Sequence, residues 1–209
     1  MLGVERASLL GAQQNDNYLY SVDRPTLAVT ITGNTVGGAP TATQNLGSNG
    51  YAGVWTTRGP FSSGKHYAEA TCVAAPASNC VPIAFADLSY DAGSGAGVLA
   101  YNAGDLGGGA GPGCSYRNNG GIFGTSPSGS STPFTTNDII SLLVNLDAGT
   151  PTFEFRKNNS TIWTGQLTTT GVVDSDWCFC SKFYQANEAA ELHLTPTYSV
   201  PSGYAFVGA

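Results

Sequence analysis

Histidine and carboxylate side chains are the first places to look for chemistry in this sequence. The chain has two histidines, His66 and His193, and both fall among apolar neighbours. A Ser-His-Asp hydrolase would also need a Gly-x-Ser-x-Gly elbow to expose its nucleophile, and the sequence has none. A His-Glu-x-x-His metal motif is also missing. We therefore expect a structural or surface role for both histidines and predict no catalytic residue.

A glycosidase would need two carboxylates on either side of a sugar bond. The best local pair is Glu188 and Glu191, but residues three apart point to opposite faces of a regular strand. The alternating carboxylates of sandwich-fold glucanases are missing as well. Glycan hydrolysis is therefore kept only as a less favoured alternative.

The cysteines, glycine runs and loop aspartates do not indicate a cofactor. The odd number of cysteines includes no Cys-x-x-Cys pair, which favours buried or half-buried free thiols over a zinc site. The run 104–109 lacks the Gly-Lys-Ser/Thr ending of a phosphate-binding loop. Asp87, Asp91 and Asp105 lack the spacing of a calcium loop. We predict no metal and no cofactor. The five cysteines are Cys72, Cys80, Cys114, Cys178 and Cys180.

The composition limits the classes of partner. Only 11% of the 209 residues are charged, 28 are glycine, and the net charge is −6. Such a chain has no basic patch to neutralise phosphates, so neither nucleic acid nor an anionic membrane is an expected partner. Residues 1–10 show no signal peptide and no apolar run that would insert into a membrane. If the protein leaves a cell, we expect release with an assembled virus.

Short runs rich in β-branched and aromatic residues, bounded by Gly, Pro, Asn and Ser, recur along the chain. They predict an all-β protein, a two-sheet antiparallel β-sandwich. The predicted strands are Leu27–Thr32, Tyr51–Thr57, His66–Val73, Val81–Asp87, Ile139–Asn145, Thr152–Lys157, Trp177–Tyr184 and Glu191–Leu194. Within Ile139–Asn145, alternate residues should face opposite sides, and at least one set should be buried.

The two ends of the chain differ in this pattern. Residues 1–23 lack strand punctuation and are interpreted as an N-terminal arm that either frays or orders against neighbouring subunits, while residues 24–209 form one sandwich domain. Glycine dominates between residues 89 and 136, which indicates long surface loops, with possible short strands at Val98–Tyr101 and Gly121–Phe123.

Two stretches resemble the SPRY domain family. Ser63-Gly64-Lys65-His66-Tyr67-Ala68-Glu69 is similar to the family's opening strand, where a Ser-Gly-Lys turn precedes an aromatic residue and a glutamate. The segment 137–159 is similar to the family's hairpin, with an apolar strand, the turn Asp147-Ala148-Gly149 and a second strand ending in Lys157-Asn158. Here Asn137, Ser141 and Asn159 stand where the family has glycine.

The resemblance spans residues 51–204 and implies a concanavalin-like jelly roll that recognises other molecules through its loops. In detail the sequence looks closer to SPRY-like modules of bacteriophage virion proteins. It therefore suggests a non-enzymatic virion structural protein, such as a head decoration, fibre or tail-tip adhesion subunit, located in the virion. An intracellular SPRY protein-recognition module is the main alternative.

The glycine-rich loops carry the side chains best suited to recognition. Their tyrosines and arginine offer stacking surface and their amides offer hydrogen bonds, although for any single tyrosine the favoured role is to hold a loop against the sandwich. Expected partners are other virion structural proteins in several copies, or a host surface glycan or protein. The predicted binding residues are Tyr90, Tyr101, Tyr116, Arg117, Asn118 and Asn119.

Overall fold

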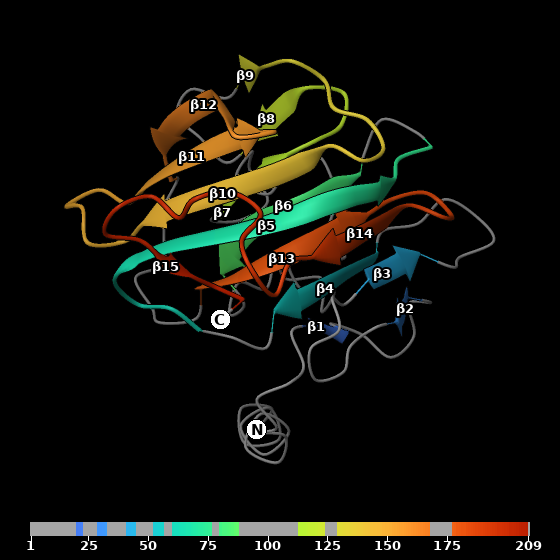
Figure 1. The fold of residues 1–209 in the computed structure, drawn as a ribbon, viewed down its shortest axis with the longest axis horizontal. Coiled ribbons are helices and arrows are strands. Elements are labelled where there is room, and N and C mark those ends of the chain that lie inside the picture. Colours follow the sequence, from blue (N-terminus) through green and yellow to red (C-terminus); the bar gives the residue numbers. More distant parts are fainter. Residues whose placement is uncertain are drawn as a thin grey trace, which may run out of the picture.

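The computed structural model describes the chain in nine stretches, and all regular secondary structure in them is β-strand (Figure 1). No helix that could cross a membrane occurs in these stretches. They are residues 20–22, 29–32, 41–44, 52–56, 60–76, 80–87, 113–123, 129–167 and 177–208.

The strands form two sheets. Sheet A has the order β1-β4-β13-β6-β7-β8-β9 and sheet B the order β12-β11-β10-β5-β14-β3-β2, with β15 added beside β5. All pairings are antiparallel except the parallel pairing of β15 with β5. The strands of sheet A are β1 (Tyr20–Val22), β4 (Ala52–Thr56), β6 (Val81–Asp87), β7 (Gly113–Tyr116), β8 (Gly121–Phe123), β9 (Gly129–Ser130) and β13 (Trp177–Phe183). Those of sheet B are β2 (Val29–Thr32), β3 (Thr41–Gln44), β5 (Lys65–Ala74), β10 (Ile139–Asn145), β11 (Thr152–Lys157), β12 (Ser160–Gln166), β14 (Ala189–Leu192) and β15 (Ala205–Phe206).

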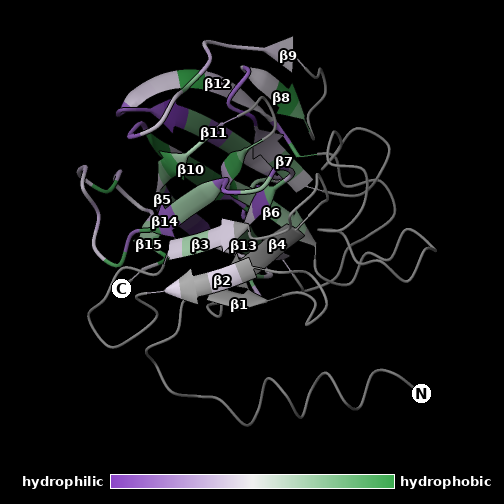
Figure 2. Cartoon of the chain, turned by 90° about the vertical axis from the view of Figure 1, so that its right-hand side faces the viewer, coloured by the Kyte–Doolittle hydropathy of each residue, from purple (hydrophilic) through white to green (hydrophobic). Residues whose placement is uncertain are grey.

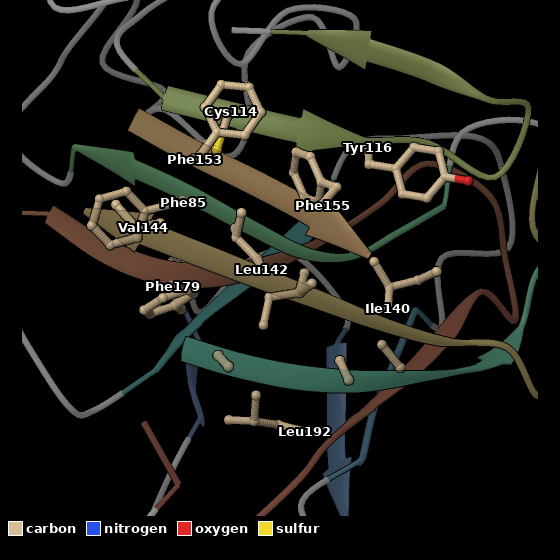
Figure 3. Close-up of a cluster of buried hydrophobic side chains, with 14 of the residues drawn as sticks. Phe85, Cys114, Tyr116, Ile140, Leu142, Val144, Phe153, Phe155, Phe179 and Leu192 are labelled. Carbon is tan, nitrogen blue, oxygen red and sulfur yellow. The ribbon is translucent and has the colours of Figure 1, made fainter. Parts of the chain in front are cut away.

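The two sheets pack as layers around one hydrophobic core. Seen from the side in Figure 2, strands β5, β10 and β14 of sheet B lie to the left of β4, β6 and β7 of sheet A. Ile140, Leu142 and Val144 point inward from β10 and are fully buried (Figure 3). Phe85 and Phe179 meet them from sheet A. The all-β sandwich predicted from the sequence is confirmed, and so is burial of one face of the strand at residues 139–145.

The β10–β11 hairpin follows the predicted boundaries. Val144 pairs with Phe153 and Leu142 with Phe155, so the inward residues of the two strands share one face. The turn is held by Asp147, whose carboxylate oxygen Oδ1 accepts the backbone N–H of Gly64 at 2.7 Å. This hydrogen bond connects the hairpin to the Ser63-Gly64-Lys65 turn that leads into β5.

Several strands have no counterpart among the predicted ones. Strand β7 (Gly113–Tyr116) lies in a stretch assigned to loops, because glycine and polar neighbours hide a short strand buried on both faces. Strand β3 also escaped prediction, whereas the short strand expected at Gly121–Phe123 is confirmed as β8. Residues 20–22 form β1 on β4, so sheet A begins three residues before the end of the predicted arm. Residues 1–19 lie outside the described part.

Strand β12 is the outer edge of sheet B. Between Phe155 and Arg156 of β11 the register shifts, because β12 carries one extra residue, Ile162. The carbonyl of Ile162 accepts the Ser131 hydroxyl at 3.2 Å. The ring of Trp163 lies over Gly129, where an added Cβ would come within 2.3 Å of it. Bulge, hydroxyl and ring together shield part of this edge from strand pairing.

The segment after β14 crosses the outer face of sheet B. It leaves β14 at Leu192, reaches the neighbourhood of Glu154 on β11 with Tyr204, and returns as β15 beside β5. In Figure 1 this red segment passes in front of β5 and β10. We call residues 195–204 the strap. It lies on the side of sheet B that faces away from sheet A.

Candidate functional site

Five connections gather at one end of the sandwich. Strand β5 ends and β6 begins there, and the antiparallel partners β7, β10, β11 and β14 end or begin at the same level. Turns and loops from both sheets therefore lie side by side. We call residues 117–120, 131–138, 157–159 and 184–188 the amide end, because asparagine is its most prominent residue.

The turn between β7 and β8 is closed by its own side chains. The N–H of Gly120 donates to the Arg117 carbonyl at 2.9 Å, and the N–H of Gly121 donates to Asn119 Oδ1 at 2.9 Å. Gly120 has a φ of 92°, and a Cβ there would lie 2.3 Å from the carbonyl oxygen of Ser131. The Arg117 guanidinium lies 4.1 Å from the centre of the Phe123 ring. The turn is thus held in one shape.

Asn118 joins three segments that are distant in sequence. Its Oδ1 accepts the backbone N–H of Cys80 at 3.1 Å, and its own N–H donates to the Cys80 carbonyl at 3.1 Å. Its carbonyl accepts the N–H of Phe134 at 3.1 Å. Asn118 therefore holds the segments of this end together, and its side-chain oxygen already accepts a hydrogen bond.

Asp138 plays a similar part in the next loop. Its Oδ2 accepts the N–H of Thr135 at 2.8 Å, and its Oδ1 accepts Nδ2 of Asn158 at 2.7 Å. Lys157 donates to the Pro133 carbonyl at 2.8 Å and lies 3.6 Å from Asp138. Burial raises the pKa of Asp138, but these hydrogen bonds and Lys157 outweigh it, so the pKa is lowered from its ordinary value.

Apart from Gly120, the left-handed backbone positions at this end are asparagines. Asn137, Asn158, Asn159 and Asn187 have φ values of 72°, 48°, 67° and 67°. Asparagine tolerates this region better than other side chains, which explains why it replaces the glycines of the SPRY pattern at residues 137 and 159. The replacement also places an amide on the surface at each turn.

The exposed residues of the amide end are uncharged and mostly polar, while Arg117, Asp138 and Lys157 are half-buried. Lys157 and Asp138 pair with each other, and Arg117 stacks on Phe123. What remains exposed is amide, hydroxyl and proline surface, which suits hydrogen bonding to a neutral partner. The exposed residues are Asn119, Thr132, Pro133, Thr135, Thr136, Asn137, Asn158, Asn159 and Asn187.

The predicted binding residues differ in where they lie and how exposed they are. Arg117, Asn118 and Asn119 lie at the amide end, and only Asn119 is exposed. Tyr116 corrects the expectation of a stacking surface: it is fully buried against Phe134 and Phe155, and its hydroxyl donates to the Thr132 carbonyl. Its size and apolar ring suit the core, while its hydroxyl fastens the neighbouring loop.

Tyr90 and Tyr101 lie outside the described residues. The strands that flank them are described: Ala86 of β6 pairs with Gly113 of β7, at the end of the sandwich opposite the Arg117–Gly120 turn. The chain thus leaves and rejoins sheet A far from the amide end on either side of these two tyrosines.

A second polar cluster lies between sheet B and the strap. Glu69 is fully buried on the outer face of β5. Its Oε1 accepts the Tyr67 hydroxyl and the N–H of Tyr198 at 3.1 Å. Its Oε2 accepts the N–H of Thr197 at 2.7 Å and lies 3.1 Å from Nδ1 of His193. Sequence reasoning missed this residue's role, because three of its four partners are 124 to 129 positions away.

Three groups of this cluster, the Glu69 carboxylate, the His193 imidazole and the Thr71 hydroxyl, lie in a row. Nε2 of His193 lies 2.7 Å from the Thr71 hydroxyl, so carboxylate, imidazole and hydroxyl follow one another in the order of a hydrolase triad. Acyl transfer also needs N–H donors aimed at a developing oxyanion. The N–H groups of Thr197 and Tyr198 donate to Glu69 instead. We therefore interpret this row of hydrogen bonds as a link between sheet B and the strap.

Hydrogen bonding sets the charge of Glu69. Burial raises its pKa, but the hydrogen bonds from His193, Tyr67, Thr197 and Tyr198 outweigh burial, and the pKa is lowered from its ordinary 4.5. Burial and the Glu69 contact raise the pKa of the Tyr67 phenol. Glu69 is consequently ionised and Tyr67 neutral at physiological pH.

The other candidate carboxylates do not face a common space. Glu188 is buried in the β13–β14 turn, where its Oε2 accepts the N–H groups of Tyr184 and Gln185 at 2.5 and 3.1 Å. Glu191 lies 3.4 Å from the Thr41 hydroxyl. No group of three or more His, Cys, Asp or Glu side chains suited to a metal ion occurs in the described stretches. All five cysteines are buried free thiols.

Comparison with known proteins agrees with the sequence resemblance at the level of fold. No protein-family model matches the chain, and no curated protein sequence matches it. Among solved structures, the SPRY domain of human HERC1 matches with a TM-score of 0.52 and 18% identity over 73% of this chain and 86% of that one. The TRIM65 PSpry domain matches with a TM-score of 0.53 and 9% identity over 91% of this chain and 98% of the other.

The chain has the SPRY fold. The second match covers nearly the whole of both chains, so the sandwich is a complete SPRY-fold unit. The SPRY-like opening motif, Ser63 to Glu69, leads into strand β5 at the centre of sheet B. The SPRY-like hairpin is β10 and β11. Both stretches that carried the resemblance thus lie next to each other in one sheet.

Proposed function

We propose that this protein is a non-enzymatic recognition module that binds another protein through the amide end. The observation that carries the proposal is the gathering of turns from both sheets into one surface whose exposed residues are uncharged and include several amides. Side-chain amides pair well with peptide groups, because each supplies one donor group and one acceptor. The turns are fixed before binding, so little conformational entropy is lost on association.

Two neighbouring turns supply the residues to test. Asn119→Asp keeps the oxygen that accepts the Gly121 N–H but removes the amide donor. Asn159→Gly keeps the left-handed backbone at a φ of 67° and removes the side chain. If these amides are central, the two changes together weaken binding at least about tenfold, or about 1.4 kcal/mol.

The measurement needs a captured partner. A photo-reactive phenylalanine at residue 119 should cross-link the partner from a lysate of the producing cells, and the affinity of that partner is then measured by calorimetry. The matched control changes exposed residues of strand β12, Thr164→Ala and Gln166→Ala, which lie on another part of the surface. Equal affinity of both double variants would overturn the proposal.

We further propose that the setting is a bacteriophage virion, where the chain serves as a head decoration, fibre or tail-tip adhesion subunit in many copies. The support is the resemblance of its sequence to SPRY-like phage modules and a surface with few charges, since only 11% of residues are charged. Its partners would be capsid or tail proteins, or a host surface glycan or protein.

The virion setting and the amide-end proposal fail separately. Mass spectrometry of purified virions should detect the chain at many copies per particle, and its absence would remove the virion setting alone. Recovery of a soluble intracellular partner would then favour a SPRY-type protein-recognition module inside the cell, with the amide end still as its binding surface.

A further inference from the structure

The outer face of sheet B is buried where a sandwich normally meets water. Tyr67, Glu69 and Ser141 are 0% exposed and Leu143 is 2% exposed, although all four point away from the core between the sheets. Leu143 pairs with Tyr67 and Ser141 with Glu69, so they form one continuous patch. In Figure 1 the strap passes in front of β5 and β10, the strands that carry this patch, and the Thr197 N–H donates to Glu69 within it.

Six of the ten strap residues are exposed, and Tyr198, Val200, Pro201 and Tyr204 are half-buried. The exposed residues are Thr195, Pro196, Thr197, Ser199, Ser202 and Gly203. Its return is secured by Val207, whose N–H donates to the Tyr67 carbonyl at 2.8 Å, and by Phe206, whose ring centre lies 5.8 Å from that of Tyr67. Its first part is secured by the two N–H groups, of Thr197 and Tyr198, that donate to Glu69.

The groups around Glu69 come from every element that packs on it. Its own strand supplies the Tyr67 phenol, which also donates to the Ser141 hydroxyl of β10 at 3.2 Å. The end of β14 supplies the His193 imidazole, and the strap supplies Tyr198. Arg156 on β11 is close enough to act on the Tyr67 phenol electrostatically. Among the described residues, no lysine or arginine donates a hydrogen bond to Glu69, so neutral donors and one imidazole hold the carboxylate.

We infer that Glu69 is a latch: its ionised carboxylate holds the strap on sheet B, and neutralising it frees the strap and uncovers Tyr67 and Leu143 while the sandwich stays folded. The carboxylate can accept all its donors at once only when ionised, because a protonated carboxyl must itself donate. The sandwich core does not depend on the latch, since its side chains lie on the other face of β5 and β10.

The direction of the pH dependence follows from the charge. The pKa of Glu69 is lowered from 4.5, so the latch contributes its full stabilisation above that value. The stabilisation is lost as the pH falls through the folded-state pKa, which lies below 4.5. Acid below this range should therefore open the strap, and neutral pH should close it.

Hydrogen exchange measured by NMR tests the latch directly on the full chain. The amides of Thr197 and Tyr198 report on the strap, and the amide of Leu142 reports on the sandwich. Protection factors, corrected for the intrinsic pH dependence of exchange, are compared between neutral and acidic samples. We expect strap protection to be lost progressively as the pH falls below 4.5, with Leu142 still protected.

Two variants and one control complete the test. Glu69→Gln should lower strap protection already at neutral pH, and Thr197→Pro should do so by removing one donor while leaving the carboxylate in place. The control is Glu191→Gln on β14 of the same sheet, where the wild-type carboxylate lies near the Thr41 hydroxyl. This change should leave the strap closed. If Glu69→Gln fails to fold, the wild-type acid series and Thr197→Pro decide the matter.

Two results would overturn the latch. Strap protection that is equal in wild type at both pH values and in the folded variants would show that the carboxylate does not hold the strap. Simultaneous loss of protection at Leu142 and in the strap would show that the strap is part of the cooperative core.

Discussion

Glu69 and Glu188 are both 0% exposed, yet the protein treats them in opposite ways. Glu69, between sheet B and the strap, has hydrogen-bond partners on both carboxylate oxygens. Glu188, in the β13–β14 turn, has two N–H donors on Oε2, and its Oε1 has no hydrogen-bond partner in the described part of the chain. Burial raises the pKa of both, but only at Glu69 do the donors reverse the shift. The number of donors, more than burial, decides the direction in which each pKa is shifted.

The largest change in the free energy of unfolding should come from removing the Glu69 side chain. Glu69→Ala removes the acceptor of a phenol, an imidazole and two N–H groups, which must then either stay unpaired or meet water as the strap opens. Each unsatisfied buried donor costs about 1–3 kcal/mol, and we expect a total loss of about 3–5 kcal/mol after partial relaxation. Urea unfolding monitored by tryptophan fluorescence measures it. A loss below about 1 kcal/mol would show that water replaces the carboxylate readily.

The pH dependence should separate the two glutamates by sign. Glu69 stabilises the fold above pH 4.5 and loses that contribution as the pH falls through its lowered pKa. Glu188 has a raised pKa, so its contribution is present below 4.5 and is lost as the pH rises through the folded value. Thermal unfolding of wild type, Glu69→Gln and Glu188→Gln over a pH series gives two difference curves, which should slope in opposite directions. Parallel curves would contradict the assignment of charge.

Removing one of the hydrogen-bond donors to Glu69 should show how much a single donor contributes to stability and to the lowered pKa of this carboxyl. Tyr67→Phe deletes the hydroxyl that donates to Glu69 and Ser141 while keeping the ring. We expect a loss of about 1 kcal/mol, the usual net contribution of one hydrogen bond. The pKa of Glu69 should also rise, so acid unfolding should begin at a higher pH than in wild type. An unchanged acid transition would mean that the other donors alone set the charge.

The smallest effect is expected at Glu188. Glu188→Gln keeps an oxygen for the N–H groups of Tyr184 and Gln185 and replaces the partnerless oxygen by an amide. Stability should change by less than about 1 kcal/mol near pH 4 and should increase at higher pH, where the wild-type carboxyl is forced to ionise. Chemical unfolding at two pH values checks this. A loss comparable to that of Glu69→Ala would make the two regions equivalent.

Sequence reasoning reached the parts of the fold that local pattern controls. The hairpin of β10 and β11 has its predicted boundaries, because residues 139–145 form an apolar run and Phe153 and Phe155 alternate about a short turn. It missed β7, because Gly113 and Ser115 contribute little to a strand pattern, and Tyr116 was therefore placed on a surface loop. The position of a short buried strand depends on neighbours that no local pattern specifies.

The candidate site was only partly predictable for the same reason. Arg117–Asn119 were found from their loop composition, and Asn119 is indeed exposed. Glu69 appeared within the SPRY-like motif, but Tyr67, Glu69 and Thr71 alternate as an ordinary solvent-facing row would. One signal was present: Leu143 on the outer side of β10 makes both faces of that strand apolar, which indicates a cover on each. The identity of the cover comes from the fold.

The strap also has a consequence for how the chain is made. A ribosome synthesises β5 more than a hundred residues before it reaches Thr197 and Val207. Until those residues emerge, Tyr67 and Leu143 lack their cover and β5 lacks its partner β15. Nascent chains with uncovered apolar strands bind one another or chaperones. Ribosome-bound intermediates that end before residue 195 should therefore be the most aggregation-prone species in the life of this protein.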